Sequence, residues 1–227
     1  MKQQYFLKNG SEIIIEQLTA NQLEDILILQ QKVIESLTTN SFLQPLTEQE
    51  FNYILSGKGL MMGAFYKEQL IAFRALLEPE VDEEHLGKDA GLPEGEWPLV
   101  LYSEISNVDP DFQGNGLQVL LGKLLLKEVD QQRFRYICTT VAPFNIASLK
   151  DKFAHGMQMI ALKVKYGDLL RYVMMKDLTS PLKEYDALEC HYVLMENTEE
   201  QQRYFQDGWI GIGIDKTDDQ WVVRFER

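Results

Sequence analysis

The 227-residue sequence predicts an α/β (α+β) fold: a mixed, mostly antiparallel sheet with one central parallel strand pair, flanked by helices, plus a small C-terminal α/β appendage. An apolar strand pattern at 99–105, a helical pattern at 117–129 and a β-rich run at 135–141 follow one another. A strand, a helix and a strand in this order predict a parallel pair with a right-handed crossover. Other strand patterns are separated by short turns and predict antiparallel hairpins, at 60–66 with 70–77 and at 159–165 with 170–175.

The N-terminal part carries clear local signals. Three consecutive isoleucines predict a buried strand within 12–16, and Thr19 is a suitable cap for the apolar-striped helix that follows. Thr47 with Glu50 three residues later forms a capping box, which predicts a short helix ending near Gly57.

Residues 79–98 are rich in glycine, proline and acidic side chains, which predicts a mobile polar loop over a site. A helix is expected at 145–155, stopped by Gly156. We expect one domain at 1–178 and a C-terminal appendage at 179–227. The appendage should contain a linker at 179–181, a strand at 188–195, a helix at 198–205 and a hairpin of 209–214 with 221–225.

Composition limits the function classes. The formal net charge is −13 and there is no basic block, which argues against nucleic acid as a partner. No run of 18 apolar residues occurs and the first ten residues are polar, so we expect no membrane partner and a cytoplasmic protein. Cys138 and Cys190 have no metal-binding spacing and are expected to be buried free thiols.

Gly114 and Gly116 lie between the strand at 99–105 and the helix at 117–129. Two glycines allow a sharp turn and leave backbone N–H groups uncovered by side chains. Together with the first-turn donors and the positive dipole end of the helix, these amides predict an anion seat. The alternative is an ordinary polar loop of an α/β domain.

Other phosphate and catalytic motifs fail. Val119 stands where a dinucleotide fingerprint has its third glycine, and no Gly-Lys-Ser/Thr sequence exists. A nucleophile elbow, a His-Glu-x-x-His motif and a Cys-x-x-Cys motif are also missing from the sequence. The histidines are scattered at His85, His155 and His191, so no metal is expected.

The run VDPDFQGNGL at 108–117 resembles the acyl-CoA motif of the GNAT superfamily of N-acetyltransferases, Gln/Arg-x-x-Gly-x-Gly/Ala preceded by Val-x-Pro. Gln113 and Gly116 match the motif, whereas Gln118 departs from it at the last place. A second family motif resembles Asn145 with Ser148 and the later Gly156. The resemblance covers about residues 10–177, including the order of helices and strands.

This resemblance implies transfer of an acetyl or other acyl group from acetyl-CoA, a co-substrate, to a primary amine by direct attack. The acceptor would be a small-molecule amine or a peptide amine, and a homodimer is possible. The implied cofactor-binding residues are Asn107, Val108, Gln113, Gly114, Asn115, Gly116, Leu117, Gln118, Asn145 and Ser148. For Asn145 and Ser148, helix capping is the alternative.

Glu104 is the candidate catalytic residue, because an ammonium must lose a proton before it attacks a thioester. The alternative is an outward-facing strand residue. Where the family usually has a tyrosine acid, this sequence has Lys152, followed by Phe153, and Tyr166 is a distant substitute. These departures leave open a catalytically silent GNAT-fold module that binds acyl-CoA or a protein partner.

Overall fold

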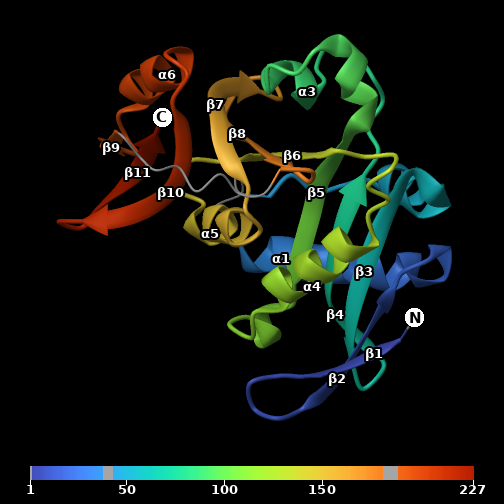
Figure 1. Cartoon of the computed structure of the whole chain (residues 1–227). Coiled ribbons are helices and arrows are strands. Elements are labelled where there is room, and N and C mark those ends of the chain that lie inside the picture. Colours follow the sequence, from blue (N-terminus) through green and yellow to red (C-terminus); the bar gives the residue numbers. More distant parts are fainter. Residues whose placement is uncertain (1, 38–42, 181–188) are drawn as a thin grey trace. The chain divides into compact units, whose positions relative to one another are not determined.

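The structure is a computed structural model that describes residues 2–37, 43–180 and 189–227 (Figure 1). The chain forms two compact units, each built from two segments. Unit 1 is Met1–Pro79 with Leu101–Asp130, and unit 2 is Glu80–Val100 with Gln131–Arg227. The domain division expected at residue 178 stays a prediction.

The strands of unit 1 follow one another in sequence order, each antiparallel to the next. They are β1 (Gln3–Phe6), β2 (Glu12–Gln17), β3 (Gly59–Tyr66), β4 (Gln69–Leu77) and β5 (Val100–Val108). The sequence did not predict β1. It also placed the end of β5 at residue 105, whereas the strand continues through Ser106, Asn107 and Val108 because these residues pair with β4.

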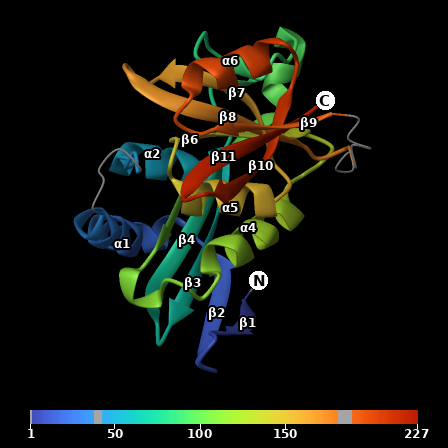
Figure 2. The ribbon, with the colours of Figure 1, turned by 90° about the vertical axis from the view of Figure 1, so that its left-hand side faces the viewer.

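Helices cover both faces of β3 and β4 (Figure 2). They are α1 (Leu23–Ser36), α2 (Glu48–Tyr53) and α4 (Leu117–Glu128). Phe73 and Ala75 of β4 lie in the apolar cluster beneath α1 and α2. Arg74, between them on the other face, donates a hydrogen bond to the backbone of α4 at Gln118. This alternation along β4 is the period of two that a strand covered on both faces requires.

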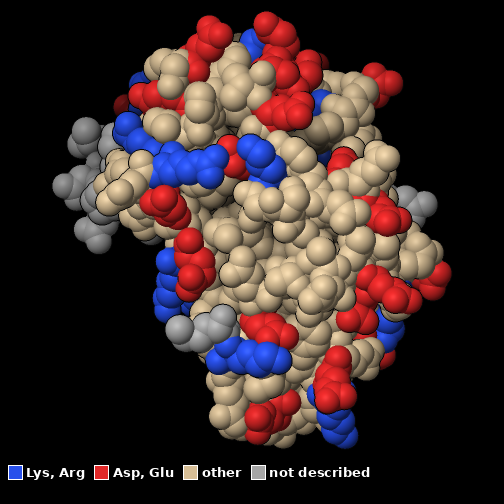
Figure 3. Space-filling model, turned by 90° about the vertical axis from the view of Figure 1, so that its right-hand side faces the viewer, with Lys and Arg blue, Asp and Glu red and all other residues tan. Residues whose placement is uncertain are grey.

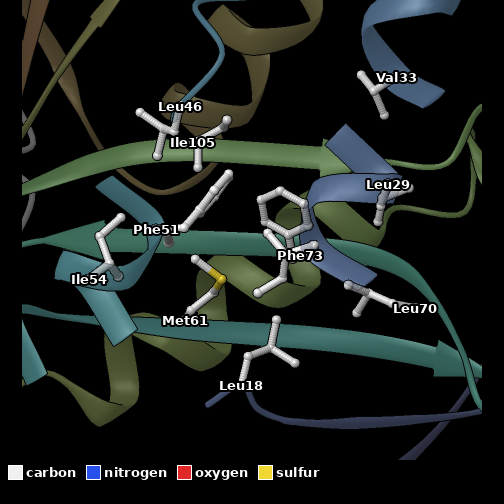
Figure 4. Close-up of a cluster of buried hydrophobic side chains, with 12 residues drawn as sticks. Leu18, Leu29, Val33, Leu46, Phe51, Ile54, Met61, Leu70, Phe73 and Ile105 are labelled. Carbon is white, nitrogen blue, oxygen red and sulfur yellow. The ribbon is translucent and has the colours of Figure 1, made fainter. Parts of the chain in front are cut away.

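The core of unit 1 lies between β3–β5 and the helices α1 and α2 (Figure 4). The rings of Phe51 and Phe73 meet edge to face, with centroids 5.8 Å apart. Both side chains are fully buried. Ile105 of β5 belongs to this cluster, so the core packs against one face of the strand that leads into the glycine turn.

The start of α2 and the end of the helical turn that follows it agree with the local sequence signals. The capping box of Thr47 and Glu50 is confirmed, with the Glu50 N–H donating to Thr47 Oγ1 at 3.3 Å and the Thr47 N–H donating to the Glu50 carboxylate at 2.6 Å. After α2 the chain makes a π-helical turn, η3 (Ile54–Lys58). Gly57 has φ +99° there, which favours glycine and confirms the predicted end of this helical stretch.

Unit 2 is a second antiparallel arrangement, with its strands in the order β6-β8-β7-β10-β11-β9. The strands are β6 (Tyr136–Val141), β7 (Gln158–Lys165), β8 (Leu169–Asp177), β9 (Cys190–Leu194), β10 (Ile210–Thr217) and β11 (Gln220–Glu226). The helices are α3 (Leu86–Asp89), η4 (Glu94–Leu99), α5 (Ile146–Ala154) and α6 (Thr198–Gln206). Pro181 of the expected linker and Leu188 at the expected strand start lie outside the described residues. The predicted mixed, mostly antiparallel α/β fold class is confirmed.

Two further expectations hold only in part. Residues 79–98 are a loop at 79–85, but they then form α3 and η4 and bury His85, whose ring stacks on Trp97 with centroids 5.5 Å apart. Asp89 in this segment also pairs with Lys163 and Lys165 at 2.9 Å. Of the two cysteines, Cys138 is buried as expected, but Cys190 is exposed.

Candidate functional site

The turn between β5 and α4 is shaped by one aspartate and two glycines. Asp109 caps the short helix η5 (Pro110–Phe112), its carboxylate accepting the Asp111 N–H at 3.0 Å. Gly114 and Gly116 have φ values of +76° and +75°. This left-handed conformation strains a residue with a Cβ, so the turn favours glycine at both places.

The space over these glycines is open. A Cβ added to Gly114 or Gly116 would meet no atom of the described residues within 4 Å. Gly116 is the N-cap of α4, and no side chain caps the helix there. First-turn N–H groups that lack a capping side chain can donate to an anion, and the helix dipole favours negative charge at this end. The turn therefore fits a phosphate or diphosphate group.

Side chains hold this loop from outside. The Asn115 Oδ1 accepts the Lys8 N–H at 3.1 Å, and its Nδ2 donates to the Phe112 carbonyl at 2.9 Å, so the Asn115 side chain fixes the loop. The buried Arg74 donates from Nη1 to the Gln118 carbonyl at 3.1 Å. Arg74 was not among the predicted site residues. Its signal in the sequence is a single cation within the apolar run 70–77.

Glu104 lies at an irregularity of β5. Ala75 of β4 pairs with Ile105, and the next residue, Leu76, pairs with Ser103, which leaves Glu104 as the extra residue of a β-bulge. A bulge bends the strand and redirects side chains, and bulges occur frequently beside active sites. The Glu104 side chain is half-buried. The sequence carried no signal for this bulge.

Asn107 and Val108 form the end of β5, opposite Phe73 and Ala72 of β4. The Asn107 side chain is fully buried at 1% exposure, and within the described part of the chain neither its Nδ2 nor its Oδ1 has a hydrogen-bond partner. Buried amides of this kind are uncommon and call for a partner.

The other predicted contacts are Asn145 and Ser148 in unit 2 and Leu117 in unit 1. Asn145 is the N-cap of α5, and its side chain accepts the Ser148 N–H at 3.2 Å. Both residues therefore have the capping geometry that was their alternative interpretation. Leu117 is buried in the first turn of α4 in unit 1, where it anchors the helix by packing.

The positions considered for an acid also lie in unit 2. Lys152 is buried and pairs with Asp151 at 3.4 Å, and Asp151 lies 3.3 Å from the imidazole of His155. The exposed Tyr166 shares a hydrogen bond with Thr140 at 3.2 Å.

On the face in Figure 3 acidic and basic side chains surround a broad uncharged area, and the basic ones form only small groups. Among the described residues, no helix is long and apolar enough to cross a membrane. No cluster of three or more His, Cys, Asp or Glu residues in the described ranges is arranged to hold a metal ion.

Comparison with known proteins gave a consistent structural result. No family model and no curated protein sequence matches this chain. Solved structures do match. The GNAT domain of S. lividans PAT superposes with a TM-score of 0.57 at 15% identity, covering 78% of this chain and 97% of that domain.

Two further structures are similar. One is a ribosomal-protein-alanine N-acetyltransferase from Brucella melitensis, with a TM-score of 0.53, 15% identity, and 72% and 99% of the two chains covered. The other is yncA, a putative acetyltransferase from Salmonella typhimurium with its cofactor acetyl-CoA, with a TM-score of 0.55, 14% identity, and 75% and 96% covered. The fold of this chain is therefore that of the GNAT N-acetyltransferases.

Proposed function

We propose that this chain is an acyl-CoA-dependent N-acyltransferase, which transfers an acetyl group from acetyl-CoA to a primary amine. The observation that carries the proposal is the open, uncapped glycine turn at the N-terminus of α4 in a chain with the GNAT fold. A turn of this kind suits the diphosphate of coenzyme A, because that group needs several convergent N–H donors.

The proposed binding roles follow the chain. The diphosphate is held by backbone N–H groups of the loop residues Gln113, Gly114, Asn115, Gly116, Leu117 and Gln118. The backbone at Asn107 and Val108 pairs with the pantetheine arm and polarises the thioester carbonyl. Asn145 and Ser148 are the cofactor contacts proposed for unit 2, in addition to their capping bond.

Glu104 is the proposed general base. Its carboxylate accepts a proton from the acceptor ammonium, directly or through water, and the free amine then attacks the thioester carbonyl carbon. The N–C bond of the amide forms and the C–S bond breaks, so coenzyme A leaves as the thiolate. The attacking nitrogen then loses its second proton, which passes to this thiolate directly or through water. Orientation of the amine against the thioester supplies much of the rate, and a backbone N–H stabilises the developing oxyanion.

The acceptor is proposed as a small-molecule amine or a peptide amine. The name of the Brucella relative assigns it a ribosomal-protein alanine, which is an amine of the second kind. The cytoplasmic location and the homodimer stay predictions.

The test has two stages. Purified protein is first titrated with acetyl-CoA by calorimetry, and then release of the coenzyme A thiol is followed across a panel of small amines and peptide N-termini. We expect binding and amine-dependent release. Failure to bind acetyl-CoA would exclude the proposal. Binding of acetyl-CoA with no release of coenzyme A in the presence of any amine would instead identify the catalytically silent module.

The variant Glu104→Gln tests the base. A general base contributes about 100- to 10,000-fold to rate, so kcat/KM should fall by at least about 100-fold while acetyl-CoA affinity is kept. Glu12→Gln is the matched control, since Glu12 is exposed on β2 of the same unit. An unchanged rate for Glu104→Gln would remove Glu104 from the mechanism.

A further inference from the structure

A lysine of α1 reaches the turn that precedes the glycine loop. The Lys32 Nζ lies 2.7 Å from Asp109 Oδ1 and 2.9 Å from its Oδ2, and 2.8 Å from the carboxylate of Asp111. The Asp109 side chain is 0% exposed and that of Lys32 is 42% exposed. Lys32 and Asp109 are 77 residues apart in the chain, so this contact joins α1 to a distant turn through a buried carboxylate.

This contact is electrostatic as well as geometric. Hydrogen bonds to Asp109 and then to Asp111 raise the pKa of Lys32, so the ammonium stays charged at neutral pH. A carboxylate that is fully buried is tolerated when it is paired and hydrogen-bonded, and removal of its cation leaves an uncompensated charge. Asp109 therefore depends on Lys32 to keep its position.

Asp109 in turn sets where the loop begins. Its N–H donates to the Ile71 carbonyl of β4 at 2.8 Å, and its carbonyl accepts the Phe112 N–H at 2.8 Å. Its carboxylate also accepts the Asp111 N–H. Asp109 thus makes the last backbone contact with β4 and shapes the turn of η5. The glycine loop follows directly after this turn.

The far end of the loop is held separately. Lys8 contacts Asn115 and Arg74 contacts Gln118, as described above. The entry to the loop is held through Asp109, so we expect a change at Lys32 to displace the N–H groups at the start of the loop, at Gln113 and Gly114. The far end should move less, because its supports come from other elements.

We infer that Lys32 is a positioning residue for donor binding, acting through Asp109 to aim the loop N–H groups at the diphosphate of coenzyme A. This inference rests on the proposed function. Its consequence is selective: Lys32 should matter for ligands that carry the diphosphate and little for the pantetheine half alone.

The experiment compares coenzyme A with pantetheine, which lacks the diphosphate. Affinities are measured by calorimetry for coenzyme A and by ligand-observed NMR for the weaker pantetheine. For Lys32→Met we expect about 10- to 100-fold weaker binding of coenzyme A, the loss expected when one charge-assisted hydrogen bond between a loop N–H group and the diphosphate is misaligned. Pantetheine affinity should change less than about 3-fold, and Lys32→Arg should restore most of the coenzyme A affinity.

Two further variants separate positioning from folding. Lys58→Met removes a half-exposed lysine that pairs with Glu78 at 3.8 Å in the same unit, and it should bind coenzyme A like the wild type. The double variant Lys32→Met/Asp109→Asn removes the buried charge with its partner, so it should unfold near the wild-type temperature while coenzyme A binding stays weakened.

The outcomes are distinguishable. If the wild type binds coenzyme A and Lys32→Met binds it equally well, or loses coenzyme A and pantetheine in the same proportion, the inference is overturned and the proposed function stands. Recovery of full affinity in the double variant would also overturn it. If the wild type does not bind coenzyme A, both the proposed function and this inference are overturned.

Discussion

Replacement of Gly116 by alanine is the sharpest probe of the turn. Gly116 has φ +75°, and a Cβ there would meet no atom of the described residues within 4 Å. The cost is therefore that of the left-handed backbone alone, about 1–2 kcal/mol, with no steric contribution. For a chain of this size each kcal/mol lowers the unfolding temperature by about 2–4 °C, so Gly116→Ala should lower it by about 2–8 °C.

The second expected effect concerns the ligand. Acetyl-CoA at 100 times its Kd stabilises a protein by about 2.7 kcal/mol. The new methyl group enters the open space that we assign to the diphosphate. We expect affinity to fall at least about tenfold, which reduces the stabilisation by acetyl-CoA at the same concentration by at least about 1.3 kcal/mol.

Gly57→Ala is the control for strain. Gly57 has φ +99° and equally open surroundings in the same unit, but it lies at η3. The assay is thermal unfolding of the three proteins with and without acetyl-CoA, supported by calorimetric titration. Both variants should lose stability, and only Gly116→Ala should be stabilised less by acetyl-CoA than the wild type. An equal response in both would refute the assignment of the diphosphate to this turn.

Other predictions concern stability and thiol chemistry. Phe73→Ala should lower the free energy of unfolding by about 3–5 kcal/mol, measured in urea, because the ring is fully buried; a loss below about 1 kcal/mol would contradict the described core. Burial raises the pKa of the Asp177 carboxyl, but hydrogen bonds, chiefly from Arg135, outweigh it and lower that pKa from 3.8 to about 2. Stability from this group is present above pH 4 and is lost as the pH falls toward 2, so thermal unfolding of Asp177→Asn should depend less on pH across that window. In the folded protein a thiol reagent should modify the exposed Cys190, whereas Cys138 should react only after unfolding because burial raises the pKa of its thiol to about 12; modification of both at once would count against this.

Much of the local structure could be predicted because its causes lie within a few residues. The capping box at Thr47 and Glu50 needs only residues three apart, and it is present with both hydrogen bonds. The glycine turn could be predicted for the same reason, since Gly114 and Gly116 meet a backbone requirement of their own positions. Residues 79–98 were predicted as a polar loop because a window of composition contains no information about distant partners such as Lys165, which pairs with Asp89.

The amino-acid sequence alone thus predicted most of the order of helices and strands, and the place of the glycine turn that we propose as the diphosphate site. Tertiary structure alone decided how that turn is supported. The bulge at Glu104 depends on the register of β5 against β4, and the contact of Lys32 with Asp109 joins residues far apart in the chain. Local conformational preference acts over a few residues, whereas strand register and buried ion pairs depend on how whole elements pack, so only the folded chain contains them.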